Sequence, residues 1–191
     1  MKKNTKKPIW LHLGCGKRNF PGFINVDLAK FKHINFRRPI NDLKIFKNNY
    51  ADLIYSSHAF EYFDRQEAPK VLKEWKRVLK KGGILRLAVP DFEAIVEVYL
   101  KYGKDLEHQG ILGPLFGRWE IPGTGKIIYH RTTYDFKSLK RLLISCGFKK
   151  VKRYDWQKTI HKDYDDHSQG YIPHMDKKKG LLMSLNIEAI K

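Results

Sequence analysis

Short β-prone segments alternate with amphipathic helical segments along this chain, and that order restricts the fold more than any other feature. Four segments have the composition of buried strands, at 9–13, 23–27, 52–55 and 84–89. Two further strands, 148–156 and 181–190, have no helix between them and are expected to pair antiparallel at one edge. The pattern predicts a Rossmann-like, doubly wound α/β fold, with a mostly parallel sheet covered on both faces and an antiparallel edge strand.

The clearest helix is predicted over 64–80. Asp64 and Glu67 have the spacing of a capping box, and Gly82-Gly83 supplies a stop. One apolar face follows at helical spacing, formed by Val71, Leu72, Trp75, Val78 and Leu79.

Two more helices are predicted, each beginning at an aspartate that serves as its N-cap. Asp91 precedes an expected apolar face made of Ile95, Val96, Tyr99 and Leu100. Asp135 precedes a buried stripe made of Phe136, Leu139, Leu142, Leu143 and Cys146.

The chain of 191 residues is expected to form one domain. Within it we distinguish a basic N-terminal tail at 1–8, an irregular glycine-rich insertion at 103–130 and a polar loop rich in His and Asp at 157–180. Two cysteines are too few for a disulfide framework, and no apolar run is long enough to cross a bilayer. These features favour a cytoplasmic protein without a transmembrane segment.

The formal net charge is +18, which suggests an anionic partner such as nucleic acid, a lipid surface or an acidic small molecule. The lysines are spread along the whole chain, however, which favours solvated faces over one binding surface. Nucleic acid therefore stays open as a partner without being favoured, and the oligomeric state is not predicted.

A glycine turn, Gly14-Cys15-Gly16, follows the first strand, and Asp27 ends the second strand. In an open α/β sheet this edge binds ligands, and a carboxylate placed there accepts hydrogen bonds from ribose hydroxyls. A dinucleotide fits poorly, because Asn19 stands where a third glycine is expected and Asp27 comes only 11 residues after Gly16. A nucleoside without phosphates fits better.

Five segments in order resemble the motifs of class I S-adenosylmethionine-dependent methyltransferases, over about residues 9–156. They are LHLGCG (11–16), GFINVDL (22–28), DLIYSSHAFEY (52–62), LKEWKRVLKKGG (72–83) and LRLAVPD (85–91). The likeness is strongest to small bacterial enzymes of cell-surface polysaccharide gene clusters.

The resemblance implies S-adenosylmethionine as cofactor. The methionine and ribose portion would be lined by Leu13, Gly14, Cys15 and Gly16. Asp27 would bind the ribose hydroxyls, Leu28 would lie beside the adenine, and Ser57 and His58 would border the methyl-transfer site. His12 departs from the pattern, because the family usually has an acidic residue there.

Three residues are candidates for catalysis. His58 leaves the third strand at the crevice and is the first candidate for a base, although it can equally cap the next helix. Asp91 ends another strand, but its role as an N-cap is favoured. His130 follows the insertion and can face an acceptor.

No metal site is predicted. His58 and Glu61 have the spacing of two ligands on one helical face, but a single pair is a weak signal. The loop at 157–180 carries a denser group, for which a solvated loop is favoured over an acceptor-binding loop or a metal site: His161, Asp163, Asp165, Asp166, His167 and His174.

The leading hypothesis is methyl transfer to a small-molecule or carbohydrate-type acceptor, which can carry an anionic group. RNA methylation is one alternative. The other is a non-catalytic binding protein that keeps the methyltransferase fold, suggested by His12 in place of the acid.

Overall fold

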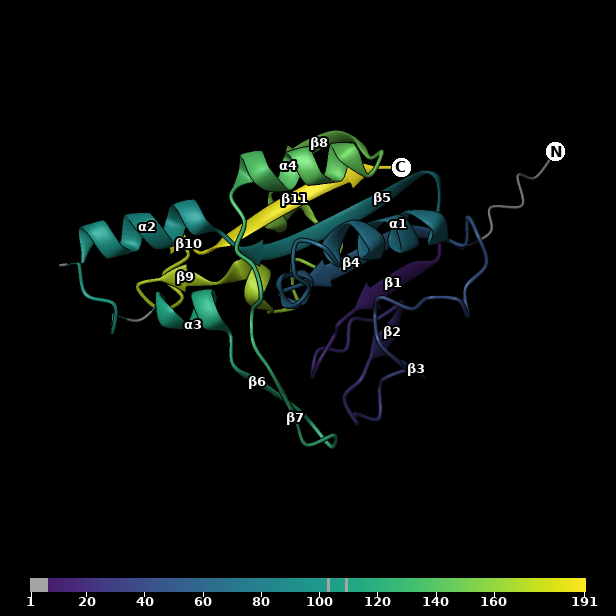
Figure 1. Ribbon diagram of the computed structural model, residues 1–191, viewed down its shortest axis with the longest axis horizontal. Helices are drawn as coiled ribbons and strands as arrows, with labels where there is room; N and C mark the ends of the chain where they lie inside the picture. The colour runs from purple at the N-terminus through teal and green to yellow at the C-terminus, as the bar shows by residue number, and fades with distance from the viewer. Residues whose placement is uncertain (1–6, 103, 109) are drawn as a thin grey trace.

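A seven-stranded sheet runs through the centre of the computed structural model, which describes residues 7–102, 104–108 and 110–191 (Figure 1). Six of the predicted N-terminal tail residues, 1–6, lie outside this range. The strand order is β3-β2-β1-β4-β5-β11-β8. The bounds are β1 Trp10–Leu13, β2 Phe23–Asp27, β3 Phe36–Arg37, β4 Ala51–Ser57, β5 Leu79–Pro90, β8 Lys149–Arg153 and β11 Ser184–Ile190.

The predicted fold class is confirmed. Strands β1 to β5 pair in parallel, whereas β11 runs antiparallel to both β5 and β8. The two last strands of the sheet therefore pair antiparallel as expected, with β8 at the edge and β11 one position inside it.

One face of the sheet is covered by helices α1 (Ala68–Val78) and α4 (Phe136–Ser145), and the main core lies between them and the strands. The predicted capping box forms: Glu67 N donates to Asp64 Oδ1 at 2.8 Å, and Asp64 N donates to Glu67 Oε2 at 3.1 Å. It closes a turn ahead of α1, so the helix itself begins at Ala68. Asp135 caps α4 as predicted, by accepting from Ser138 N at 2.7 Å.

The predicted end of the first helix at Lys80 is wrong. The helix ends at Val78 and β5 begins at Leu79, so Gly82 and Gly83 lie inside a strand. Leu79 pairs with Ala51, and the register then shifts before Ile84 pairs with Leu53. Gly82 has φ of +75°, which lets the chain turn within this irregularity.

The predicted apolar face of the second helix is partly wrong. Helix α2 (Phe92–Lys101) buries Ala94, Ile95 and Val98, whereas Val96 and Leu100 are exposed. The reason is its position: α2 extends beyond the main sheet, where a small second core packs against one side of it (Figure 1).

The chain forms no helix between β1 and β2 that could cover the opposite face of the sheet. This face is covered by the segment after β8, which contains the 3₁₀ turns η2 (Trp156–Lys158) and η3 (His167–Gln169). His161, Asp166 and Ser168 are buried there, and the hydroxyl of Tyr55 donates to Asp166 Oδ2. The favoured interpretation of 157–180 as a solvated loop is therefore wrong for these residues, although Asp163 and Asp165 are exposed.

The insertion at 103–130 is more regular than predicted. It contains helix α3 (Leu112–Phe116) and a hairpin of β6 (Trp119–Ile121) and β7 (Lys126–Ile128). Further along the chain, β9 (Tyr171–Ile172) and β10 (Leu181–Leu182) form a separate two-stranded sheet. Among the described helices, none combines the length and apolar character needed to cross a membrane.

Candidate functional site

The carboxyl ends of β1, β2 and β4 meet at one edge of the sheet, because these three strands are neighbours and run parallel. This geometry brings together the predicted binding residues of three separate motifs. They are Leu13, Gly14, Cys15, Gly16, Asp27, Leu28 and Ser57.

The glycine turn uses its two glycines differently. A Cβ on Gly14 would lie 2.4 Å from the Cβ of Ala59, so this glycine is needed for close packing against the segment after β4. Gly16 has φ of +52° and nothing within 4 Å of an added Cβ, so its outer side is open. The side chains of Leu13 and Cys15 are buried, so they can meet a ligand only through their main chain.

Asp27 lies directly beside the open side of Gly16. Its Oδ2 accepts the N–H of Gly16 at 2.7 Å, and its Oδ1 accepts the N–H of Ala29 at 2.8 Å. A carboxylate offers about four lone pairs, so two acceptor positions remain for a ligand. Burial and the neighbouring Asp27 raise the pKa of Cys15 to about 12, which keeps this thiol protonated.

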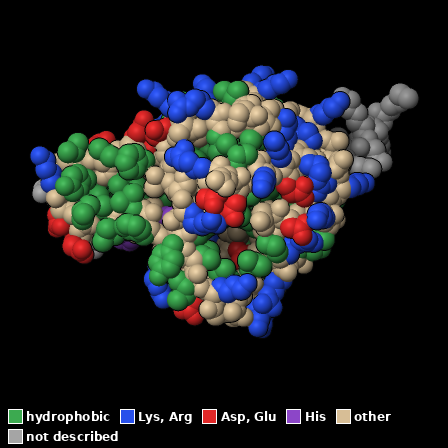
Figure 2. All heavy atoms as spheres, in the orientation of Figure 1, with side chains coloured by type: hydrophobic (Ala, Val, Ile, Leu, Met, Phe, Trp, Pro, Cys, Tyr) green, Lys and Arg blue, Asp and Glu red, His purple; other side chains and the backbone are tan. Residues whose placement is uncertain are grey.

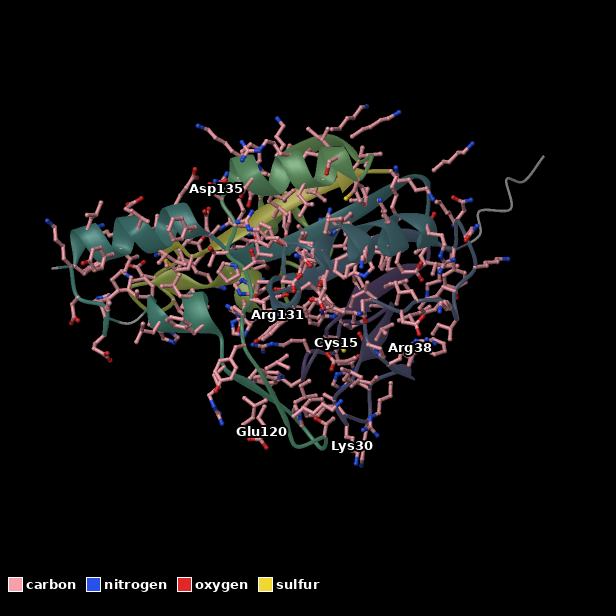
Figure 3. The ribbon with its side chains drawn as sticks, in the orientation of Figure 1. Cys15, Lys30, Arg38, Glu120, Arg131 and Asp135 are labelled. Carbon is pink, nitrogen blue, oxygen red and sulfur yellow. The ribbon has the colours of Figure 1, made fainter. Side chains whose placement is uncertain are left out.

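A cavity of about 470 Å³ adjoins Leu28. Arg37 forms part of its wall and donates from Nε to the carbonyl oxygen of Leu28 at 3.1 Å. The rest is supplied by the β6–β7 hairpin, through Ile121, Gly123, Thr124 and Lys126. The hairpin is held by Lys30 N, which donates to Pro122 O at 3.0 Å, and Lys30 lies at the hairpin tip in Figure 3.

The contribution of the hairpin was missed from the sequence. The signal was present, because Pro122-Gly123-Thr124-Gly125 separates two short β-prone runs, as in a hairpin with a glycine-containing loop. The contact of the hairpin with Lys30 could not be predicted from the local pattern, because Lys30 is distant in sequence.

His12 does not face the crevice. It is 1% exposed and stacks on Phe20 with a centroid distance of 4.7 Å, in an aromatic cluster with Tyr55 and His161. Burial, together with His161, lowers the pKa of His12 to about 3, so the ring is neutral. His12 therefore takes a packing role on the second face of the sheet.

His58 and His130 meet at a residue that was not among the predicted site residues. Glu61 lies in η1 (Phe60–Tyr62) and is fully buried. Its Oε1 is 3.7 Å from His58 Nδ1 and 3.5 Å from His130 Nε2. The spacing of His58 and Glu61 was a partial signal in the sequence, whereas the approach of His130 depends on the path of the insertion.

Asp91 lies apart from that cluster. Its Oδ1 accepts the N–H of Glu93 at 3.1 Å as the N-cap of α2, and its Oδ2 pairs with Arg153 at 2.9 Å. Both oxygens thus contribute to the fold, and a catalytic role for Asp91 stays a prediction.

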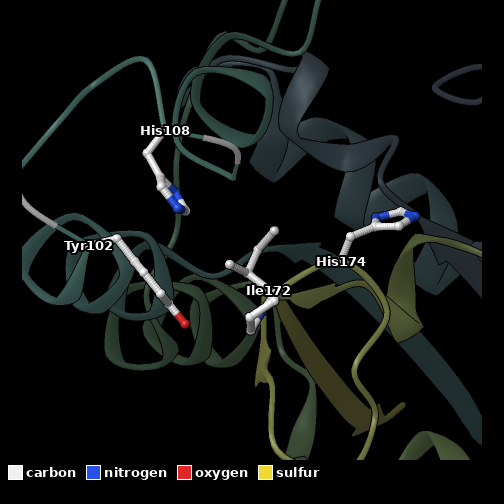
Figure 4. A pocket seen from close by; sticks show the side chains of 5 residues that line it. Tyr102, His108, Ile172 and His174 are labelled. Carbon is white, nitrogen blue, oxygen red and sulfur yellow. The ribbon is translucent and has the colours of Figure 1, made fainter.

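Within the described ranges, no group of three or more His, Cys, Asp or Glu residues has an arrangement that could hold a metal ion. A second cavity, of about 150 Å³, is lined by Tyr102, His108, Ile172, Pro173 and His174 (Figure 4). It lies beside α2 and β9 and shares no lining residue with the cavity at Leu28.

Comparison with known proteins agrees with this geometry. A family described as a methyltransferase domain matches residues 22–87, from the entry to β2 into β5. Solved structures with a similar fold include two S-adenosylmethionine-dependent methyltransferases. The one from Archaeoglobus fulgidus has a TM-score of 0.56 at 16% identity, with 96% of this chain and 86% of that chain covered. The one from Mesorhizobium loti has a TM-score of 0.52 at 16% identity, with 96% of this chain and 91% of that chain covered. This chain has the methyltransferase fold.

A third similar structure is the 1,6-didemethyltoxoflavin-N1-methyltransferase of Burkholderia thailandensis, which contains bound S-adenosylhomocysteine. Its TM-score is 0.54 at 11% identity, with 97% of this chain and 72% of that chain covered. No curated protein sequence matches the chain.

Proposed function

We propose that this protein binds S-adenosylmethionine at the glycine turn and transfers its methyl group to an acceptor. The observation that carries the proposal is the open side of Gly16 next to Asp27, whose carboxylate keeps free acceptor positions. The methyltransferase family match and the similar solved structures support the same function.

The described residues fit this cofactor. Asp27 would accept hydrogen bonds from the ribose hydroxyls, and the adenine would lie beside Leu28 in the cavity closed by the hairpin. A volume of about 470 Å³ is within the range of roughly 300–1,000 Å³ that is usual for ligand sites. Ser57 contributes a buried hydroxyl without a hydrogen-bond partner at the end of β4.

When bound, the cofactor supplies an electrophilic methyl group on a sulfonium. The protein's task is then to align the acceptor with that group and to exclude water. An oxygen or nitrogen acceptor also loses a proton, and His58 is our candidate for the base because it lies next to the glycine turn through Ala59. Burial, with His167 and His130 nearby, lowers the pKa of His58, so its ring is neutral as a base requires.

Thermal unfolding with S-adenosylmethionine, S-adenosylhomocysteine and NAD tests the binding step. A ligand at 100 times its dissociation constant adds about 2.7 kcal/mol, which corresponds to a shift of roughly 5–11 °C for a chain of this size. We expect a shift with both sulfur nucleosides and none with NAD. The absence of any shift at millimolar concentration would contradict the proposal and favour a binding protein that has kept the fold.

We propose a small-molecule or carbohydrate-type acceptor, attracted by basic residues if it is anionic. On the visible face, Lys and Arg side chains occur at many separate places rather than along one groove (Figure 2). That distribution favours a small acceptor over a nucleic-acid track. The alternative of RNA methylation predicts tight RNA binding that weakens steeply with salt.

The hairpin offers a prediction about cofactor affinity. In a Gly123→Val variant the new Cβ would lie 2.5 Å from Lys30 Cδ, which forces the hairpin away from Leu28. Gly125→Val is the matched control, because Gly125 has a similar φ of +69° with open space around it. Both changes carry the strain of roughly 1–2 kcal/mol of a left-handed residue. We expect only Gly123→Val to weaken S-adenosylhomocysteine binding in a calorimetric titration; equal affinities would contradict a role for the hairpin.

A further inference from the structure

Hydrogen bonds around His58 and His130 determine which nitrogen of each ring carries the proton. Ser184 Oγ donates to Asn186 Oδ1 at 3.0 Å, so it accepts from His58 Nε2, also at 3.0 Å. His130 Nδ1 lies 2.8 Å from the carbonyl oxygen of Pro114, which can only accept. Burial lowers the pKa of both rings, so both are neutral. The remaining nitrogens, His58 Nδ1 and His130 Nε2, therefore carry lone pairs.

Both of these nitrogens lie near the same oxygen, Oε1 of Glu61, at 3.7 Å and 3.5 Å, without forming a hydrogen bond in this structure. Neither carboxyl oxygen of Glu61 has a hydrogen-bond partner, and the side chain is fully buried. An ionised carboxylate in this place would be a buried charge without a cationic partner, whereas a carboxylic acid can donate to either histidine. The arrangement therefore favours the protonated acid. Burial has the same effect and raises the pKa of Glu61 to about 8, opposed in part by the main-chain amides of Glu61 and Phe60.

The cluster adjoins the glycine turn. Gly14 packs against Ala59, which lies between His58 and η1, so the turn and the cluster share this short segment. In the proposed function, the methionine end of the cofactor lies over the same turn. Its sulfonium carries a positive charge, and the thioether of the product S-adenosylhomocysteine does not.

We propose that Glu61 distinguishes the cationic cofactor from its neutral product: it is a carboxylic acid in the free protein and releases its proton to solvent when a sulfonium binds nearby. This inference rests on the proposed function. The resulting carboxylate compensates the sulfonium charge in a site of low polarity. Methyl transfer turns the sulfonium into a thioether and frees one proton from the acceptor. His58, the proposed base, takes up this proton and passes it to Glu61, so charge and protons balance over the cycle.

The other titratable groups near Glu61 are not expected to release a proton near neutral pH when the cofactor binds. Burial lowers the pKa of His58, His130 and His167 and raises the pKa of Tyr62 and Tyr134. Of the nearby cations, Arg131 pairs with Asp64 and Glu67, and Arg65 lies over the ring of Tyr134. Near neutral pH, Glu61 is thus the group of this cluster that changes its charge.

Calorimetric titration in two buffers of different ionisation enthalpy measures the proton release. S-adenosylmethionine and S-adenosylhomocysteine carry the same groups apart from the sulfonium. Because the sulfonium also lowers the pKa of the ligand's own ammonium group, the Glu61→Gln variant is titrated in parallel to measure that contribution. At pH 7 we expect release of a proton with the first ligand and none with the second. We also expect the ratio of their affinities to favour the cation increasingly from about pH 6.5 to pH 8.5, by about tenfold for each unit by which the sulfonium lowers the pKa of Glu61.

Glu61→Gln is the test variant, because an amide can still donate to both histidines but cannot ionise. We expect it to bind S-adenosylhomocysteine normally and to lose both the proton release and the pH dependence. Glu93→Gln removes an exposed carboxylate on α2 as a control and should behave as the unchanged protein. If Glu61→Gln does not fold, the comparison of the two ligands at pH 6.5, where the ammonium group of both is protonated, decides the matter in the unchanged protein.

The same proton release with both ligands, or an unaltered release in Glu61→Gln, would overturn the role of Glu61 while leaving cofactor binding intact. Binding of neither nucleoside would overturn the proposed function and this inference with it.

Discussion

Asp27→Ala is expected to lower the affinity for S-adenosylhomocysteine by roughly 100-fold. Two hydrogen bonds from ribose hydroxyls to a carboxylate contribute about 1.5–3 kcal/mol each, so their loss costs about 3 kcal/mol or more. Asp52→Ala is the control, because Asp52 is a partly exposed carboxylate that pairs with Lys80 near the amino end of β4, whereas the glycine turn lies at the carboxyl ends of the strands. The measurement is the dissociation constant of each variant, with the thermal midpoint recorded to confirm folding.

Asp27 also accepts the N–H groups of Gly16 and Ala29, so its removal can change the glycine turn as well as the ribose contacts. These two causes of a weaker affinity must be separated. The 2′-deoxy analogue of the ligand separates them in a double-mutant cycle. If Asp27 binds the ribose, the analogue binds more weakly than the parent ligand to the unchanged protein. The two ligands bind equally to Asp27→Ala, which has no side-chain acceptor for the hydroxyls. Equal binding of both ligands to the unchanged protein would contradict the assignment.

Acid should destabilise this protein through two buried histidines. His12 is 1% exposed and His161 fully buried, and burial lowers the pKa of each to about 3 from 6.5. Because the unfolded chain binds more protons than the folded protein between these values, the free energy of unfolding falls as pH drops from 6.5 toward 3. At pH 4.5 the loss is roughly 2–3 kcal/mol for each ring.

His161→Phe should remove the contribution of one ring, roughly 2–3 kcal/mol at pH 4.5. Both ring nitrogens of His161 lack hydrogen-bond partners, and the ring packs against Phe20 and Tyr55, so a phenyl ring of similar shape suits the site. Urea unfolding at pH 7 and pH 4.5 measures the effect. His174→Gln, at an exposed histidine, should leave the pH dependence unchanged. An unaltered loss of stability in His161→Phe would show that other groups cause it.

Most of the sheet could be predicted from the sequence, because its strands carry local signals. β2 has the predicted bounds 23–27, and the caps at Asp91 and Asp135 form through their own side chains. The end of α1 could not be predicted, because the pairing of Leu79 with Ala51 is a tertiary contact that ends the helix before its glycines.

In the candidate site, too, some residues could be predicted from local signals and others depend on tertiary contacts. The residues at strand ends, such as Gly16 and Asp27, come together because parallel neighbours share an edge. The contact of Glu61 with His130 and the contribution of the β6–β7 hairpin were missed. Both depend on residues, His130 and Lys30, that approach from distant parts of the chain. The histidine at position 12 packs in an aromatic cluster that the segment after β8 completes. This segment covers the second face of the sheet and brings His161 next to Tyr55 and His12.

A crystal structure of the protein with S-adenosylhomocysteine tests the central claim most directly. The account predicts the ribose hydroxyls within hydrogen-bond distance of Asp27, the adenine beside Leu28 under the β6–β7 hairpin, and the sulfur over the glycine turn toward His58. A nucleoside bound elsewhere, for example in the cavity lined by Tyr102 and His174, with the open side of Gly16 left to solvent, would contradict it.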